Sequence, residues 1–127
     1  MNGNNQLLNL QDKEAEKNIR EMAQCFVSSI DPIKIILFGS FANGSYDQES
    51  DVDFYLVVND DTDVSEATDK AYKSVRYVKT RPVDIVVGTH SRYESKGKSK
   101  HSLMLEGEVM RNGILLYEQN RDGRAAV

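Results

Sequence analysis

The alternation of apolar and polar residues predicts one helix followed by several short buried strands. Between residues 13 and 30 the apolar side chains recur every three or four positions, which places them on one face of a helix. Asp12 precedes this segment and is of a residue type favoured at helix N-caps, whereas Asp31-Pro32 ends it. Gly88 is predicted to end the last of three short apolar runs, which have the length and the β-branched residues typical of buried strands: 33–38, 52–58 and 83–87.

A second helical stripe begins near residue 64 and is predicted to continue to the stop at Arg81-Pro82. A last helix is predicted to end at Gly113, and residues 114–117 have the pattern of a short closing strand. The polar and basic segment 91–100 between them is interpreted as solvated surface. We therefore predict an α/β (α+β) fold with a small mixed β-sheet of about four strands flanked by helices.

The length of 127 residues indicates one domain with a single core. We assign residues 1–12 to a flexible N-terminus, 13–118 to the folded domain and 119–127 to a disordered tail. No apolar run approaches the roughly 20 residues that cross a bilayer, so no membrane association is expected. The lone cysteine, Cys25, argues against a disulfide framework, and together with the absence of a signal-peptide pattern it favours a cytoplasmic location.

The stretch from Gly39 to Asp53 carries the first candidate chemistry, because it joins two predicted strands through a turn and an acidic pair. Gly39 permits a sharp turn, and Ser40 offers a hydroxyl and an N–H group at the start of a short helix, where a nucleotide phosphate binds well. Asp51 and Asp53 are two positions apart on an extended segment, so both side chains leave one face and can share a hard cation such as Mg²⁺. Alone, each feature is weak, because an isolated D-x-D at a strand entrance is usually a solvated turn.

Asp84 is the third candidate ligand, because it is a charged residue inside the apolar run PVDIVVG. A carboxylate in such a run is costly unless it is paired or bound to metal. If this strand lies beside the one that carries Asp51 and Asp53, three carboxylates converge and suffice for two metal ions. The alternative interpretation is that Asp84 is a strand-end acid paired with Arg81 or Lys79.

Together these residues resemble the nucleotidyltransferase superfamily of DNA polymerase beta. The pattern is Gly39-Ser40, ten intervening residues, Asp51-Val52-Asp53 and a later apolar-Asp-apolar strand at Asp84. The chain looks most like the small stand-alone members, the minimal nucleotidyltransferases of the MntA-like antitoxin type, and the likeness extends to the ending HSLMLEGEVMRNGILLYE. The resemblance implies the polymerase-beta-like nucleotidyltransferase fold, with Gly39 and Ser40 binding nucleotide and with Asp51, Asp53 and Asp84 as catalytic metal ligands.

The resemblance also implies a reaction and a partner. It implies transfer of a nucleoside monophosphate, AMP from ATP, to an acceptor hydroxyl with release of pyrophosphate and with two Mg²⁺ ions. Similar minimal nucleotidyltransferases pair as antitoxins with a HEPN-type RNase toxin and add AMP to one of its tyrosines, so the implied partners are a nucleoside triphosphate and a HEPN-type toxin. One position departs from the pattern: Asn43 stands where many minimal members carry arginine, which bears on phosphate contact or partner docking by that arginine.

Two other classes of function stay open. A binding module with this fold would neutralise its partner by docking, without catalysis. An enzyme that modifies a small hydroxylated compound, as aminoglycoside nucleotidyltransferases do, would need a substrate domain or a dimer to form its pocket. The residues leave both a homo-oligomer and a hetero-oligomer open. The net charge of −4 disfavours duplex nucleic acid as a partner, because binding to a phosphate backbone draws on a basic surface.

Overall fold

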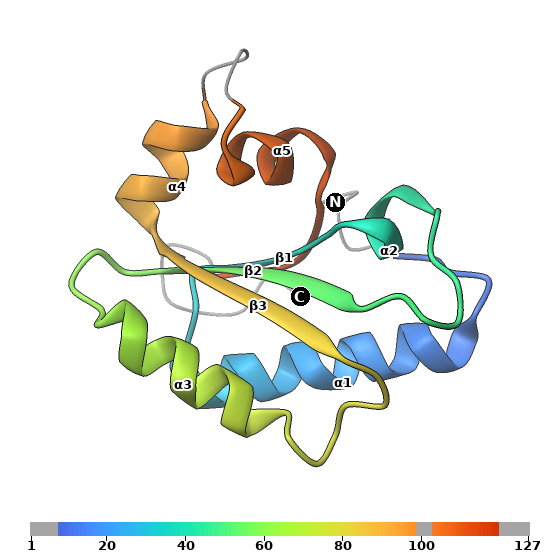
Figure 1. Cartoon of the computed structure of the whole chain (residues 1–127). Coiled ribbons are helices and arrows are strands. Elements are labelled where there is room, and N and C mark those ends of the chain that lie inside the picture. The colour runs from blue at the N-terminus through green and yellow to red at the C-terminus, as the bar shows by residue number, and fades with distance from the viewer. Residues whose placement is uncertain (1–7, 99–102, 120–127) are drawn as a thin grey trace.

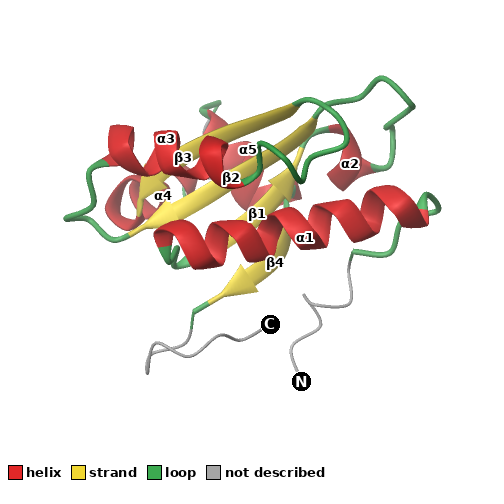
Figure 2. Ribbon diagram, turned by 90° about the horizontal axis from the view of Figure 1, so that it is seen from below, coloured by secondary structure: helices red, strands yellow, loops and turns green. Residues whose placement is uncertain are grey.

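In the computed structural model, which describes residues 8–98 and 103–119, a central sheet carries helices on both of its faces (Figure 1). Figure 2 shows α1 and α3 side by side across one face of this sheet. The elements follow one another as α1 (Lys13–Ile30), β1 (Lys34–Phe38), α2 (Ser40–Asn43), β2 (Val52–Val58), α3 (Val64–Ser74), β3 (Val83–Thr89), α4 (His90–Gly97), α5 (Leu105–Asn112) and β4 (Ile114–Glu118).

The sheet formed by the described residues has four strands in the order β3-β2-β1-β4. Strand β1 is antiparallel to both β2 and β4, whereas β2 and β3 are parallel. A parallel pair needs a crossover connection, and α3 supplies it by packing against α1 and β3 on one face of the sheet. The predicted small mixed sheet of about four strands with flanking helices is confirmed.

The alternation of side chains along β2 divides the core into two layers. Phe54 and Leu56 point toward α1 and α3, within the larger cluster of buried apolar residues. Tyr55 and Val57 point the opposite way, into a smaller cluster completed by residues of α4 and α5. Because successive strand residues face opposite sides, Asp53 lies on the same face of the sheet as Tyr55.

The long first helix begins and ends where the sequence predicts. The carboxylate of Asp12 accepts a hydrogen bond from the backbone N–H of Ala15 at 3.0 Å, which satisfies one of the unpaired donors of the first turn. Asp31 follows the helix with a left-handed backbone (φ 48°). Leu8 and Leu10 are also buried in the larger cluster, so packing begins inside the N-terminal segment that the sequence suggested to be flexible.

The second long helix is shorter than predicted. It ends at Ser74, and the chain from Val75 onward turns instead of continuing to Arg81-Pro82. Val75 is fully buried and Val78 is half-buried, so their spacing mimics a helical stripe although they lie in turns. The turn is held from α1 by Asn18, whose side-chain amide donates to the Val78 carbonyl at 2.8 Å and accepts from the Thr80 N–H at 3.1 Å.

One prediction about the region after β3 is wrong. Gly88 does not end the strand, which continues to Thr89, and Gly88 pairs with Val57 in the parallel ladder. A side chain at Gly88 would collide with the Tyr55 hydroxyl, so the glycine is explained by close packing. Most described residues of the segment interpreted as solvated surface are exposed, whereas Tyr93 of α4 is buried against the sheet.

The predicted ends of the chain lie partly outside the described residues. Residues 1–7 and 120–127 are in this category, as are residues 99–102 between α4 and α5. Gln119 continues the closing strand, because its backbone N–H donates to the Ile33 carbonyl at 2.8 Å. Within residues 8–98 and 103–119, no helix is both long and apolar enough to cross a bilayer.

The Asn18 contacts predict a specific loss of stability. Asn18→Ala leaves the Val78 carbonyl and the Thr80 N–H without their partner, and a buried polar group without a partner costs about 1–3 kcal/mol. We expect the free energy of unfolding, measured with urea, to fall by about 2 kcal/mol. The control is Gln24→Ala at an exposed position of the same helix. Equal stability of the two variants would show that Asn18 does not hold the turn.

Candidate active site

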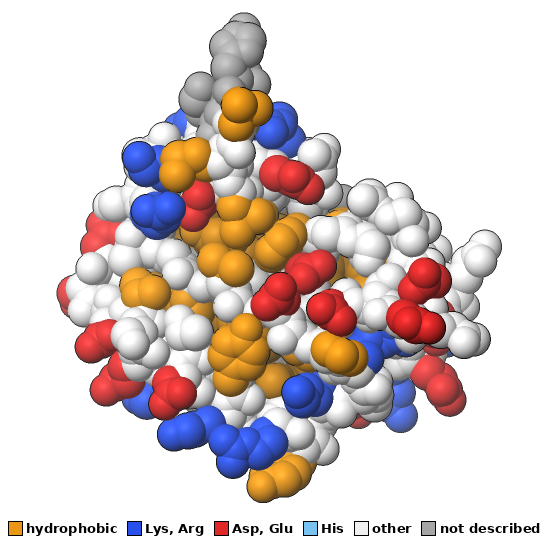
Figure 3. All heavy atoms as spheres, viewed as in Figure 1, with side chains coloured by type: hydrophobic (Ala, Val, Ile, Leu, Met, Phe, Trp, Pro, Cys, Tyr) orange, Lys and Arg blue, Asp and Glu red, His pale blue; other side chains and the backbone are white. Residues whose placement is uncertain are grey.

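Two of the predicted acids are direct neighbours across the parallel strands. Asp53 of β2 and Asp84 of β3 are register partners, so their side chains leave the same face of the sheet. Asp53 is half-buried and Asp84 is exposed. Figure 3 shows acidic side chains gathered over the beginnings of β2 and β3, beside a hydrophobic area of the surface. The structure therefore brings together two acids that stand 31 positions apart in the chain.

Asp51 lies just before β2, and its negative charge acts on Asp53. The N–H of the following residue, Val52, donates to the Pro82 carbonyl at 3.0 Å, which holds the entrance of β2 against the entrance of β3. The pKa of Asp53 is raised to about 6, first because burial disfavours its charged form and then because the carboxylates of Asp84 and Asp51 repel it. The three acids thus form one electrostatic cluster.

The predicted phosphate turn borders this cluster. Gly39 follows β1 with φ 76° and ψ −154°, a backbone conformation that side chains rarely allow. A side chain added at Gly39 would also collide with the carboxylate of Asp53, so the turn and the acid touch. Ser40 begins the short helix α2, whose first N–H groups have no partner within the helix. A donor-rich turn therefore lies directly beside an acceptor-rich carboxylate cluster.

Asn43, which stands where the resembled family often has arginine, has a local role in this structure. Its side-chain oxygen accepts from the backbone N–H of Ser45 at 2.9 Å and from the Ser45 hydroxyl at 2.6 Å. These bonds close the turn after α2, where Gly44 has a left-handed backbone. Asn43 therefore shapes the loop that leads from the phosphate turn to the acids.

The paired alternative for Asp84 is not observed. Within the described residues, the ion pair of Arg81 is with Asp12, and Asp84 forms an ion pair with neither Arg81 nor Lys79. Arg81 instead donates to backbone carbonyls of the loop before β2. Sequence reasoning gave Arg81 only a possible pairing role, because contacts to carbonyls depend on backbone positions that spacing does not reveal.

The donor set of the cluster fits a hard divalent cation. Carboxylate oxygens are the ligands that Mg²⁺ prefers, and the raised pKa of Asp53 shows negative charge that neighbouring groups leave uncompensated. No group of three His, Cys, Asp or Glu side chains among residues 8–98 and 103–119 already converges on one point. Asp51 and Asp84 are exposed, so both side chains can change rotamer toward a shared cation.

A second polar cluster fixes the helices above the acids, and sequence reasoning missed it. The Tyr55 hydroxyl donates to the Glu106 carboxylate at 2.7 Å, and Arg92 donates to the same oxygen at 3.0 Å. Glu106 is only 3% exposed, and its other carboxylate oxygen is buried without a partner. Because Tyr55 follows Asp53 by two positions on the same face, this contact ties α4 and α5 to the strand that carries the acid.

Apolar side chains flank the carboxylates on the sheet surface. Phe38 is the register partner of Asp53 on β1, and Val86 follows Asp84 by two positions on β3. Both are half-buried and pack against the smaller apolar cluster. The acids thus lie at the border between an apolar surface and the polar loop after α2.

Comparison with known proteins agrees with this arrangement. Residues 15–115 match the model of the family described as nucleotidyltransferase domain. A candidate nucleotidyltransferase from Sulfolobus solfataricus is 18% identical with a TM-score of 0.53, and the match covers 87% of this chain and 86% of that chain. A toxin-antitoxin structure with AMP-PNP is 22% identical with a TM-score of 0.52, and the match covers 82% of this chain and 77% of that chain. No curated protein matches the sequence.

The family match covers most of the chain and every predicted site residue. It begins within α1, ends within β4, and includes the turn at Gly39-Ser40 and the acids Asp51, Asp53 and Asp84. The two solved structures, at their low identities, show a shared fold alone. The mixed sheet with its flanking helices is the polymerase-beta-like fold that the sequence predicted. The chain therefore belongs to the nucleotidyltransferase domain family.

Proposed function

We propose that this protein transfers a nucleoside monophosphate, AMP from ATP, to an acceptor hydroxyl with release of pyrophosphate. The observation that carries the proposal is the contact between Gly39 and the Asp53 carboxylate, which joins a phosphate-binding turn to the acid cluster. The similar toxin-antitoxin structure was determined with AMP-PNP, an observation on that protein that supports a nucleoside triphosphate as substrate here.

In this proposal each site residue has a defined task. Gly39 and Ser40 donate hydrogen bonds to the outer phosphates through the N–H groups and hydroxyl at the start of α2. Asp51, Asp53 and Asp84 would hold two Mg²⁺ ions. These ions, when bound, neutralise charge on the triphosphate and on the acceptor oxygen. Most of the barrier to phosphoryl transfer is overcome by positioning and charge stabilisation, which are the contributions that these residues make.

The transfer step conserves atoms and charge. The acceptor oxygen forms a bond to the α-phosphorus of ATP while the bond from that phosphorus to the bridging oxygen of the β-phosphate breaks, and pyrophosphate leaves. The proton of the acceptor hydroxyl passes to the Asp84 carboxylate, which is the exposed member of the parallel pair. Asp53 would hold the cations, and positive charge beside it would lower its raised pKa and favour its ionised form.

We further propose that the acceptor is a hydroxyl of a protein partner, a HEPN-type toxin in the cytoplasm. The similar toxin-antitoxin structure supports a protein partner, and the open position of the acids at the beginnings of β2 and β3 supports access by a large molecule. The second candidate function is docking without catalysis. The observation that favours docking is that the three carboxylates do not already converge on one point among the described residues.

Asp53→Asn separates these two functions. The assay supplies ATP labelled at the α-phosphate to a lysate of the cells that express the protein and measures the label that enters macromolecules. We expect this incorporation to fall at least 100-fold, because one metal carboxylate is lost. Asp61→Asn, an exposed acid of the loop after β2, is the control and keeps wild-type transfer. Transfer by Asp53→Asn at the wild-type rate would refute the assignment. Absence of transfer by the wild type, with partner binding unchanged in Asp53→Asn, would favour docking.

The raised pKa of Asp53 predicts how stability depends on pH. Its folded pKa of about 6 exceeds the ordinary aspartate value of 3.8, so the native state binds more protons between these values and the free energy of unfolding falls as pH rises. Without divalent cations at pH 8, we expect Asp53→Asn to be more stable than wild type by about 1 kcal/mol, after allowance for solvent screening. Urea unfolding in EDTA at pH 8 and pH 3 measures the difference, which should vanish at pH 3, below both pKa values.

Addition of Mg²⁺ should reverse this order at pH 8. A ligand that binds the native state stabilises it, so 10 mM Mg²⁺, an order of magnitude above its expected dissociation constant of about 1 mM, should raise the unfolding midpoint of wild type alone. If the wild type in EDTA at pH 8 were as stable as Asp53→Asn or more stable, that result would show that the acids do not repel one another.

Gly39→Ala and Gly44→Ala form a matched pair. Both glycines have positive φ angles, 76° and 87°, so both substitutions strain the backbone, and the strain is larger at Gly39, whose ψ of −154° lies outside the left-handed helical region. A side chain at Gly39 would collide with the Asp53 carboxylate, whereas one at Gly44 would meet nothing within 4 Å. We expect Gly39→Ala to lower nucleotide transfer at least 100-fold and Gly44→Ala to lower it less than threefold. Equal activity of the two variants would show that the turn does not position the acid.

A further inference from the structure

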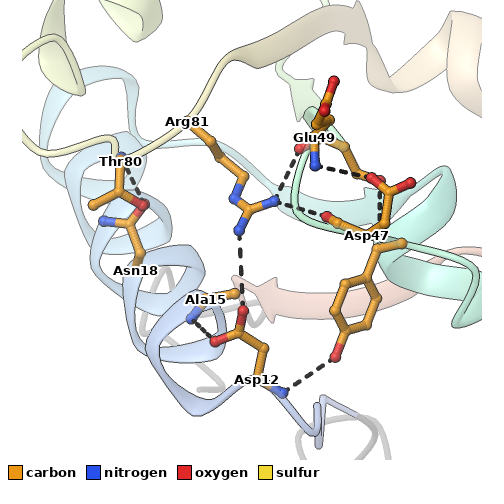
Figure 4. Close-up of polar contacts among 9 residues, drawn as sticks. Asp12, Ala15, Asn18, Asp47, Glu49, Thr80 and Arg81 are labelled. Carbon is orange, nitrogen blue, oxygen red and sulfur yellow. Dashed lines mark hydrogen bonds and ion pairs between the residues drawn. The ribbon is translucent and has the colours of Figure 1, made fainter.

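Arg81 binds the loop that connects α2 to the acids (Figure 4). One terminal nitrogen of its guanidinium, Nη1, donates to the Asp47 carbonyl at 3.2 Å and to the Ser50 carbonyl at 3.1 Å. The other, Nη2, lies 4.0 Å from the carboxylate of Asp12, which caps α1. The arginine therefore reaches from the entrance of β3 to the middle and the end of this loop and to the N-cap of the first helix.

The guanidinium also lies on an aromatic stack. It is 5.0 Å from the ring centre of Phe41 in α2, and the rings of Phe41 and Tyr46 stack with centroids 4.4 Å apart. The Tyr46 hydroxyl accepts from the backbone N–H of Asp12 at 3.2 Å, which closes a ring of contacts around the arginine. The Arg81 side chain is only 17% exposed, so these contacts are largely shielded from water.

This ring of contacts holds the residues on which the acid cluster depends. Ser50, whose carbonyl binds Arg81, directly precedes Asp51. The residue after Arg81, Pro82, accepts through its carbonyl from the N–H of Val52, directly after Asp51. Asp51 is thus fixed on both sides by consecutive residues of the segment that leads to Asp84. A displacement of Arg81 would move Asp51 relative to the other two acids.

We propose that Arg81 is a positioning residue that sets the place of Asp51 relative to Asp53 and Asp84 for cation binding. The inference rests on the proposed function, because it concerns the same acids. Arg81 acts through the loop, because its guanidinium faces the Asp47 and Ser50 carbonyls and Asp12. The task needs arginine, because a planar group with several N–H donors can bind two carbonyls and stack on a ring, whereas lysine has a single compact ammonium.

The experiment compares Arg81→Lys with Arg76→Lys. Arg76 is an exposed arginine in the same segment between α3 and β3, and its guanidinium lies over Tyr77, outside the site. The assay follows transfer of label from α-labelled ATP into lysate macromolecules, with the rate divided by the amount of folded protein. The measurement is the Mg²⁺ concentration that gives half of the maximal rate. We expect Arg81→Lys to raise this concentration at least tenfold, and Arg76→Lys to leave it unchanged.

The outcomes separate this inference from the function beneath it. A merely structural arginine would lower the melting temperature and the folded fraction without changing the half-activating concentration, and that result would overturn the inference alone. Absence of transfer by the wild type would overturn the proposed function and this inference with it. If Arg81→Lys does not fold, Phe41→Leu, which removes the ring under the guanidinium, replaces it. We then expect a shift of at least threefold, and an unchanged value would overturn the inference.

Discussion

The parallel pairing of β2 with β3 in the observed register is the constraint on which the candidate site depends. It places Asp53 beside Asp84, and the resulting repulsion contributes to the raised pKa of Asp53. Two features maintain the register despite that repulsion. The crossover helix α3 packs the strands against α1, and a large apolar cluster fills the face opposite the acids. The acids therefore lie on the face with the smaller apolar cluster, and the larger cluster on the other face supplies most of the apolar burial.

Within residues 8–98 and 103–119, no lysine or arginine forms an ion pair with Asp51, Asp53 or Asp84. Arg81 is the nearest arginine along the chain to Asp84, yet its guanidinium turns to two loop carbonyls and to Asp12. Burial and like charge both raise the free energy of an ionised Asp53, and an arginine beside it would have lowered both costs. A divalent cation bound beside Asp53 would offset the same repulsion, and this effect would last only while the cation is bound. Stability and ligand binding are thus coupled through one carboxylate.

Much of the fold could be predicted because strands and helices differ in apolar period. The β-branched runs predicted β1, β2 and β3. The helical spacing predicted α1 with its cap at Asp12. The end of α3 could not be predicted, because Val75 and Val78 keep a helical spacing while they lie in turns held by Asn18. The site acids were found from their spacing, but their meeting depended on which strands are neighbours. The Tyr55–Glu106 contact spans 51 positions and leaves no local pattern.

The energetics of the acid cluster support the proposal of catalysis over the proposal of docking. A complex is stabilised by charges that are complementary between the partners, whereas like charges that repel within one partner destabilise that partner. A docking module would therefore be more stable if Asp53 were neutral. The arrangement at Gly39 sharpens this point, because a glycine with a strained backbone leaves room for the Asp53 carboxylate and for nothing larger. Strain and repulsion at one place are expected where a ligand compensates both. A triphosphate with its cations supplies the charges that such a turn and such a cluster lack.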